Sequence, residues 1–110
     1  MQNAVKFSQN GRILTALLSG EIDHHIAKQQ REEIDAALFK IRPELLVLDF
    51  SEVKFMDSSG IGLIIGRAEL CDGIGCRVNI TGLSKTLEKL VRLSGIEKIK
   101  CLSVVEKRGV

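Results

Sequence analysis

The sequence is poor in residues that several functions require. Its 110 residues include four Phe but no Tyr or Trp, so few aromatic side chains are available to stack on nucleic-acid bases. Sixteen Lys and Arg against fourteen Asp and Glu leave a net charge of only +2. These charges are interspersed along the chain, without a basic block that could bind a polyanion. The composition therefore does not indicate direct binding to nucleic acid.

Cysteine pairs and long apolar segments are also lacking. The three cysteines, Cys71, Cys76 and Cys101, include no Cys-x-x-Cys pair, which argues against a disulfide framework and against a zinc site. No apolar run approaches the ~20 residues that span a bilayer, and residues 1–6 lack the apolar core of a signal peptide. We therefore expect a cytoplasmic protein with reduced thiols, no metal, no cofactor and no membrane contact.

The apolar content, 45% of the chain, is enough for the core of one domain. Residues 4–8 and 12–19 read as strands, and Asn10-Gly11 between them predicts a hairpin with a type I′ turn. Further strands are expected at 45–50, 76–81 and 98–104, and helices at about 24–40, 58–72 and after Ser84. The pattern predicts a single α/β domain over residues 1–110, with a mixed β-sheet of about five strands formed by an N-terminal hairpin and then β-α-β units.

Local signals predict where the helices begin and end. Asp23 is the best cap for the first helix, and Arg42-Pro43 ends it because the residue before proline avoids the α region. Ser84 is expected to cap the third helix and Gly95 to end it. Gly62 and Gly66, one turn apart in the second helix, predict close packing of its backbone against the sheet or another helix.

One polar stretch joins the most apolar strand to the most apolar helix. Asp57 and Ser58 are residue types that cap helices, and glycines 60 and 62 leave the first turn with little side-chain cover. A hydroxyl there is exposed beside the positive end of the helix dipole, which favours a negatively charged group. Two interpretations stay open: an ordinary helix cap, or a site at which Ser58 accepts a phosphate.

Catalysis is not indicated. Asp57-Ser58-Ser59-Gly60 is not a G-x-S-x-G elbow, and the only histidines are His24 and His25. Gly60-x-Gly62 lacks the further glycines, or the Gly-Lys-Ser/Thr ending, of phosphate-binding loops. We therefore expect no enzyme and no catalytic residue.

Two motifs carry a resemblance to a known family. FMDSSGIG at residues 55–62 resembles the signature loop of the STAS-domain anti-sigma factor antagonists. GEIDHH at residues 20–25 resembles the family's other loop, in the sporulation branch that antagonises the anti-sigma factor of sigma F. The similarity extends from about Ala4 to Cys101. It implies a STAS-like sheet with its helices largely on one side, followed by a C-terminal helix for which residues 105–110 are too short.

The resemblance also implies a function. The unphosphorylated protein would bind an anti-sigma factor that is also a serine kinase, and so release sigma factor F. The kinase, which holds ATP and Mg²⁺, would inactivate the protein by phosphorylating Ser58, and a PP2C-type serine phosphatase would reverse this. The free protein is expected to be a monomer. The expected partner-binding residues are Glu21, Asp23, His24, Asp57, Ser58, Ser59, Gly60 and Gly62.

An alternative from another functional class stays open. The chain could be a STAS-type sensory or scaffold domain of another pathway, such as the general stress response. It would then bind a ligand or a protein complex, and Ser58 would act only as a helix cap. An enzyme is the least favoured option.

Overall fold

The computed structural model describes residues 4–105. Its elements in chain order are β1 (Val5–Asn10), β2 (Ile13–Ile22), α1 (His24–Ile41), β3 (Leu45–Met56), α2 (Ser58–Gly73), β4 (Arg77–Thr81), α3 (Lys85–Ser94), a 3₁₀ turn (Ile96–Lys98) and β5 (Leu102–Val104). The strands form one sheet in the order β1-β2-β3-β4-β5. Only β1 and β2 pair antiparallel, and the other pairs are parallel. The predicted α/β fold with a five-stranded mixed sheet is confirmed.

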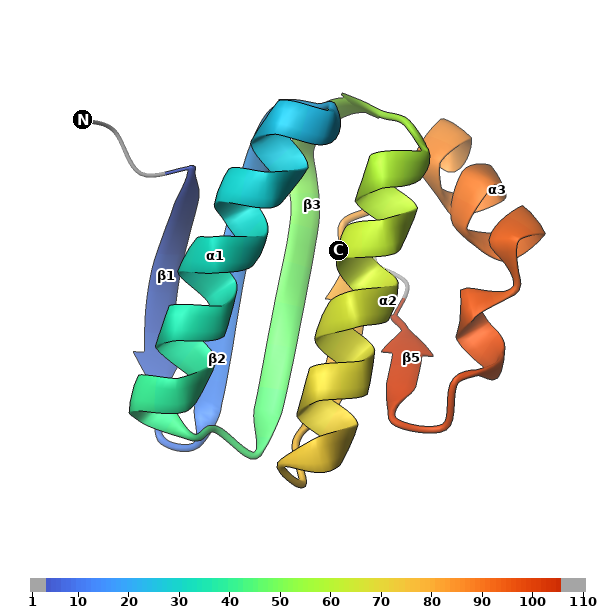
Figure 1. Ribbon diagram of the computed structural model, residues 1–110. Helices are drawn as coiled ribbons and strands as arrows, with labels where there is room; N and C mark the ends of the chain where they lie inside the picture. Colours follow the sequence, from blue (N-terminus) through green and yellow to red (C-terminus); the bar gives the residue numbers. More distant parts are fainter. Residues whose placement is uncertain (1–3, 106–110) are drawn as a thin grey trace.

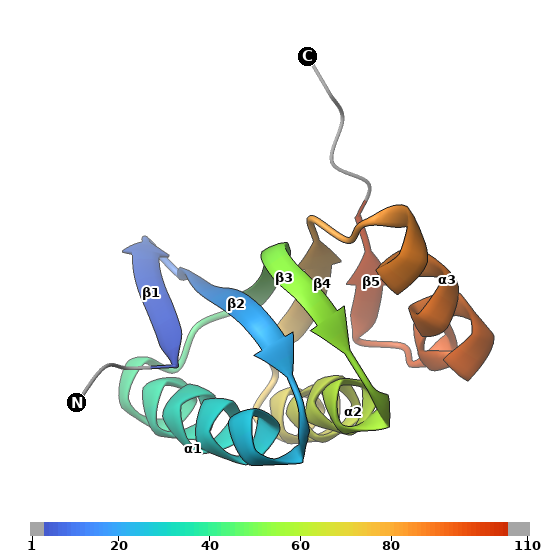
Figure 2. The same cartoon turned by 90° about the horizontal axis from the view of Figure 1, so that it is seen from above.

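The parallel pairing of the strands determines on which side of the sheet the helices lie. Each strand-helix-strand unit makes a right-handed crossover, which brings successive helices to the same side of the sheet. Helices α1 and α2 lie side by side under one face, and α3 lies beyond β5 at the end of the twisted sheet (Figure 1, Figure 2). The predicted arrangement, with the helices largely on one side, is therefore confirmed.

The core lies between this face of the sheet and the helices. Because side chains alternate between the two faces of a strand, every second residue of the central strands points toward α1 and α2. Burying each such aliphatic side chain contributes about 1.5–3 kcal/mol. Residues of this kind that are at most 1% exposed include Leu14, Ala16, Leu18, Leu46, Leu48, Phe50, Val78 and Ile80.

The N-terminal hairpin forms with a different turn from the one expected. Asn10 pairs with Ile13, so the two-residue loop is Gly11-Arg12 rather than Asn10-Gly11. A type I′ turn needs a positive φ at both central residues, but only Gly11, at φ 61°, has one here. The prediction of a type I′ turn is therefore wrong. A positive φ at the first central residue alone is the pattern of type II′.

Strand β3 is longer than predicted. It continues past Phe50 to Met56, and β2 likewise continues to Ile22. Residues 51–55 are mostly polar and exposed, so their composition resembles that of a loop. Their backbone nevertheless continues the pairing with β2, which is interrupted by two register shifts. The expected loop before α2 is thereby reduced to Asp57. Strand β5 is shorter than predicted, because a 3₁₀ turn and a tight turn occupy residues 96–101.

The predicted close packing at Gly62 and Gly66 is wrong. A Cβ atom added at either position would meet nothing within 4 Å. The close approach is at Gly60 instead, where an added Cβ would lie 2.6 Å from the sulfur of Met56. A second one is at Gly82, which has a φ of 77° and whose added Cβ would lie 2.7 Å from the backbone nitrogen of Ser51. These two glycines let the start of α2 and the β4–α3 connection pack closely on β3.

The three cysteines are free and buried. Burial raises the pKa of each thiol, most strongly that of Cys71, and a raised pKa leaves little reactive thiolate. We expect the folded protein to react with a thiol reagent at neutral pH at least about tenfold more slowly than the denatured chain, which should expose all three thiols. Cys101, the most exposed of the three at 8%, should react first. Rapid labelling of Cys71 in the folded protein would contradict this.

The sequence also made predictions about membrane-spanning segments and about the C-terminal tail. No helix within residues 4–105 is long and apolar enough to cross a bilayer. The tail expected to be too short for a further helix lies, beyond Val105, outside the described residues.

Candidate functional site

The two motif segments, residues 20–25 and 55–62, meet at one edge of the sheet. Strands β2 and β3 are parallel, so both end at this edge, and α1 and α2 begin there (Figure 1). Ile22 pairs with Met56, and the backbone N–H of Asp57 donates to the carbonyl oxygen of Ile22 at 3.3 Å. Ligands of parallel sheets commonly bind at this edge. Two segments far apart in the sequence thus form one continuous surface.

Both helices at this edge are capped by aspartate. Oδ1 of Asp23 accepts a hydrogen bond from the N–H of Ile26 at 2.9 Å, as predicted, and Oδ1 of Asp57 accepts one from the N–H of Ser59 at 2.7 Å. Ser58 is the first residue of α2, and its exposed hydroxyl makes no hydrogen bond to any residue between 4 and 105. The interpretation of Ser58 as only a cap is therefore wrong, because Asp57 has that role.

This difference predicts unequal effects on stability. Asp57→Ala should lower the free energy of unfolding by about 1 kcal/mol, the usual effect of losing an N-cap. Ser58→Ala should change it by less than about 0.5 kcal/mol, since no hydrogen bond within residues 4–105 is lost. Urea denaturation measures both, with Asp23→Ala as the matched cap variant in α1. Equal losses for Asp57→Ala and Ser58→Ala would show that the hydroxyl of Ser58 also supports the helix.

The other expected partner-binding residues differ in exposure. Glu21, Asp23 and His24 are exposed at the same edge as Asp57 and Ser58. Ser59 is half-buried, Gly60 is buried against Met56, and Gly62 is exposed. Of the two adjacent serines, Ser58 thus presents the more accessible hydroxyl. The structure also exposes Phe55, 54% accessible at the end of β3, which the sequence did not single out as a surface residue.

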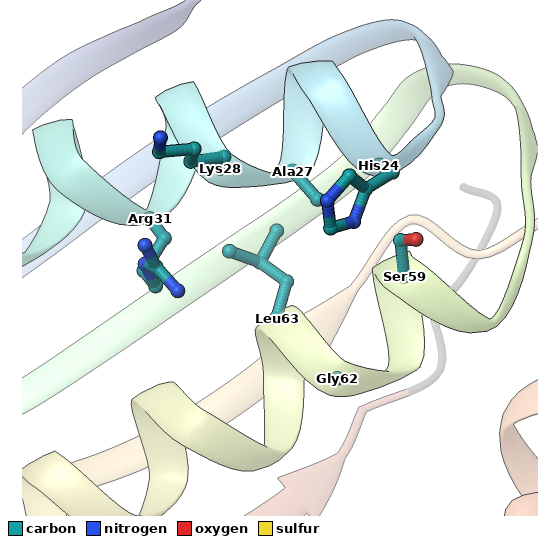
Figure 3. Close-up of a pocket in the computed structure, with 7 residues that line it drawn as sticks. All are labelled: His24, Ala27, Lys28, Arg31, Ser59, Gly62 and Leu63. Carbon is teal, nitrogen blue, oxygen red and sulfur yellow. The ribbon is translucent and has the colours of Figure 1, made fainter.

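A groove of about 380 Å³ lies between the N-terminal halves of α1 and α2 (Figure 3). Its floor contains the buried Ala27 and Leu63, and its α1 wall carries the exposed Lys28 and Arg31. These two cations were missed as site residues, because the sequence shows them only as part of a polar helix face. Their spacing of four and seven residues from His24 could have placed them on one side of α1. The groove is lined by His24, Ala27, Lys28, Arg31, Ser59, Gly62 and Leu63.

A buried ion pair links the two helices. Nε of Arg67 lies 2.9 Å from Oδ1 of Asp35, and the two side chains are 7% and 30% exposed. These atoms are at ion-pair distance but not in hydrogen-bond alignment. Burial raises the pKa of Asp35 and lowers that of Arg67, and the attraction between the two charges opposes both shifts. The sequence did not indicate that these two residues pair. It also gave no sign that Gln30, whose amide has no hydrogen-bond partner among the described residues, is fully buried.

Comparisons with known proteins agree with the fold. The sequence of residues 4–107 matches the STAS domain family. An anti-sigma F factor antagonist of Paenibacillus polymyxa is 32% identical over 90% of this chain and 85% of its own length. An anti-sigma-B factor antagonist of Bacillus subtilis is 27% identical over 96% and 95%.

Solved structures of the anti-sigma factor antagonist SpoIIAA are also similar. The unphosphorylated form is 28% identical, with a TM-score of 0.80 over 96% of this chain and 89% of that one. The phosphorylated form from Bacillus, also 28% identical, has a TM-score of 0.73 over 96% and 92%. The similarity covers almost the whole sequence and includes every element that builds the site. The chain therefore belongs to the STAS domain family.

Proposed function

We propose that this protein is an anti-sigma factor antagonist whose unphosphorylated form binds an anti-sigma factor that is also a serine kinase. Phosphorylation of Ser58 then ends the binding. The observation that carries this proposal is the free, exposed hydroxyl of Ser58 at the first position of α2, where Asp57 already caps the helix. The relative from P. polymyxa bears the name of such an antagonist, and SpoIIAA has been solved with and without its phosphate.

The position of Ser58 suits a switch that changes binding rather than fold. The N-terminus of a helix favours negative charge, so a phosphate can be added there without disrupting α2. A phosphoserine carries about −1.5 to −2 charges at neutral pH, and the exposed Glu21, Asp23 and Asp57 lie at the same edge. Burying this charge against a partner without a matching cation is costly.

The remaining residues of the two segments have supporting roles in this proposal. Glu21, Asp23 and His24 form the part of the docking surface beside α2. Ser59 and Gly60 hold the first turn, and the open space around Gly62 lets a partner approach the backbone of α2. The protein acts in the cytoplasm, as a monomer when free and without an activity of its own, and a PP2C-type phosphatase restores it.

We assign the protein to the sporulation pathway of sigma F. The P. polymyxa relative of that pathway is the more similar in sequence, at 32% identity against 27% for the anti-sigma-B factor antagonist of B. subtilis. The latter supports a second candidate, the same type of antagonist in a general stress response. A kinase preference between an anti-sigma F and an anti-sigma-B factor distinguishes the two.

The direct test is phosphorylation. The protein is incubated with Mg-ATP and the anti-sigma F factor of P. polymyxa, and its intact mass and peptides are then measured. We expect one added phosphoryl group, on Ser58, that is absent from Ser58→Ala and retained in Ser59→Ala. If a kinase active on its own antagonist adds no phosphate here, the sigma F assignment is wrong. Modification by an anti-sigma-B factor instead would favour the stress pathway.

A further inference from the structure

We propose that the groove between α1 and α2 binds an acidic segment of the anti-sigma factor, in which a carboxylate lies beside an apolar side chain. This inference rests on the proposed function and specifies the chemistry of its partner. It assigns the carboxylate to Lys28 and Arg31, and the apolar side chain to the floor formed by Ala27 and Leu63.

The charge in the groove is positive and unpaired. Lys28 and Arg31 are exposed, and within residues 4–105 neither takes part in an ion pair or a side-chain hydrogen bond. Asp35, one turn after Arg31 on α1, attracts Arg31, but its carboxylate forms its ion pair with Arg67 at 2.9 Å. A partner carboxylate would therefore meet two cations that form no ion pair within residues 4–105.

The two aspartates that cap α1 and α2, which form the rim next to the groove, are in contrast already engaged. The carboxylates of Asp23 and Asp57 each accept a hydrogen bond from a backbone N–H at the start of their helix. The helix termini offset part of their negative charge. The rim thus does not cancel the attraction that Lys28 and Arg31 exert on an anionic group.

The shape and polarity of the groove suit protein side chains. Ala27 and Leu63 are 8% and 4% exposed and give the floor an apolar character. Gly62 leaves the α2 wall open, because an added Cβ there would meet nothing within 4 Å. A volume of about 380 Å³ is at the small end of ligand sites. It is enough for a few side chains of a docked segment.

The location of the groove links it to the switch. Ser59 lines the groove and Ser58 directly precedes it. A phosphate on Ser58 would repel a carboxylate seated in the groove and would compete with it for Lys28 and Arg31. Both effects weaken binding, so an acidic segment in the groove explains how a phosphate on Ser58 would release the partner.

The test compares two double variants, each of which removes two positive charges from the protein. The anti-sigma F factor of P. polymyxa, held with Mg-ADP so that no phosphate is transferred, is titrated into each variant by calorimetry. Lys28→Gln with Arg31→Gln should raise the Kd by about 10- to 100-fold and reduce its dependence on salt. The control, Arg77→Gln with Lys100→Gln, also removes two positive charges. Both residues line a separate groove of about 280 Å³ at the start of β4. This control should alter the Kd by less than roughly threefold.

Each other outcome overturns a defined part of the proposal. If the wild-type protein binds and the groove variant binds equally well, the acidic-segment inference is wrong while the proposed function stands. If the wild-type protein does not bind, the sigma F assignment is wrong, and failure to bind an anti-sigma-B factor as well would overturn both the proposed function and this inference. If inorganic phosphate alone displaces the anti-sigma factor, the groove is a small-anion site. Loss of a self-associated dimer in the groove variant would instead identify a second copy of this chain as the occupant.

Discussion

Ser58→Asp should weaken binding to the anti-sigma factor by roughly 100-fold, because it places a fixed negative charge in the docking surface. Such a change corresponds to about 2.7 kcal/mol of binding free energy. The exposed Ser58 side chain, at the first position of α2, makes no hydrogen bond to any residue between 4 and 105, and Asp57 caps the helix. Thermal unfolding should therefore be nearly unchanged, and calorimetric titration measures the loss of affinity directly.

The matched control for this variant is Ser58→Asn, which has the size of aspartate without its charge. It should bind within about threefold to fivefold of the wild-type protein, since only the hydroxyl and a little space are changed. Binding of Ser58→Asp at wild-type strength would rule out charge as the basis of the switch. Equal weakening by Asp and Asn would point to a steric effect instead.

Asp35→Ala should lower the free energy of unfolding by about 2–4 kcal/mol, because it leaves the buried Arg67 without its counter-ion. Arg67 is only 7% exposed, whereas Asp35 is 30% exposed. Arg67→Met should consequently cost less than Asp35→Ala, since the carboxylate left behind can reach water. Chemical denaturation of both single variants measures this asymmetry.

The double variant Asp35→Leu with Arg67→Met tests whether the pair itself is stabilising. Burial raises the pKa of Asp35 despite the arginine beside it, so the folded protein binds this proton more tightly than the unfolded chain does. The proton on Asp35 therefore stabilises the fold below the ordinary pKa of 3.8. This stabilisation is lost as the pH rises through the raised pKa that Asp35 has in the folded protein. We expect the apolar pair to be at least as stable as the wild type at neutral pH. A double variant as unstable as Asp35→Ala would contradict this.

The features that the sequence predicted correctly depend on short-range interactions. The cap at Asp23 and the helix that follows it need only a carboxylate, a few backbone N–H groups and an apolar repeat nearby. The same holds for Ser84, whose hydroxyl accepts from the N–H of Leu87, and for Gly95, which ends α3 at a φ of 76°. Alternation of such segments was enough to predict the mixed sheet.

The sequence by itself therefore determined the fold class and the helix starts, and it singled out residues 20–25 and 55–62 as the candidate site. Only the tertiary structure decided the features that need a distant partner. Pairing with β2 extends β3 to Met56 and leaves Asp57, rather than Ser58, as the cap. The groove cations and the Asp35–Arg67 pair likewise emerge only when α1 packs beside α2. The sequence around a charged residue of a helix is the same whether its side chain lies in water, in a groove or beside a buried counter-ion. Packing alone distinguishes these environments.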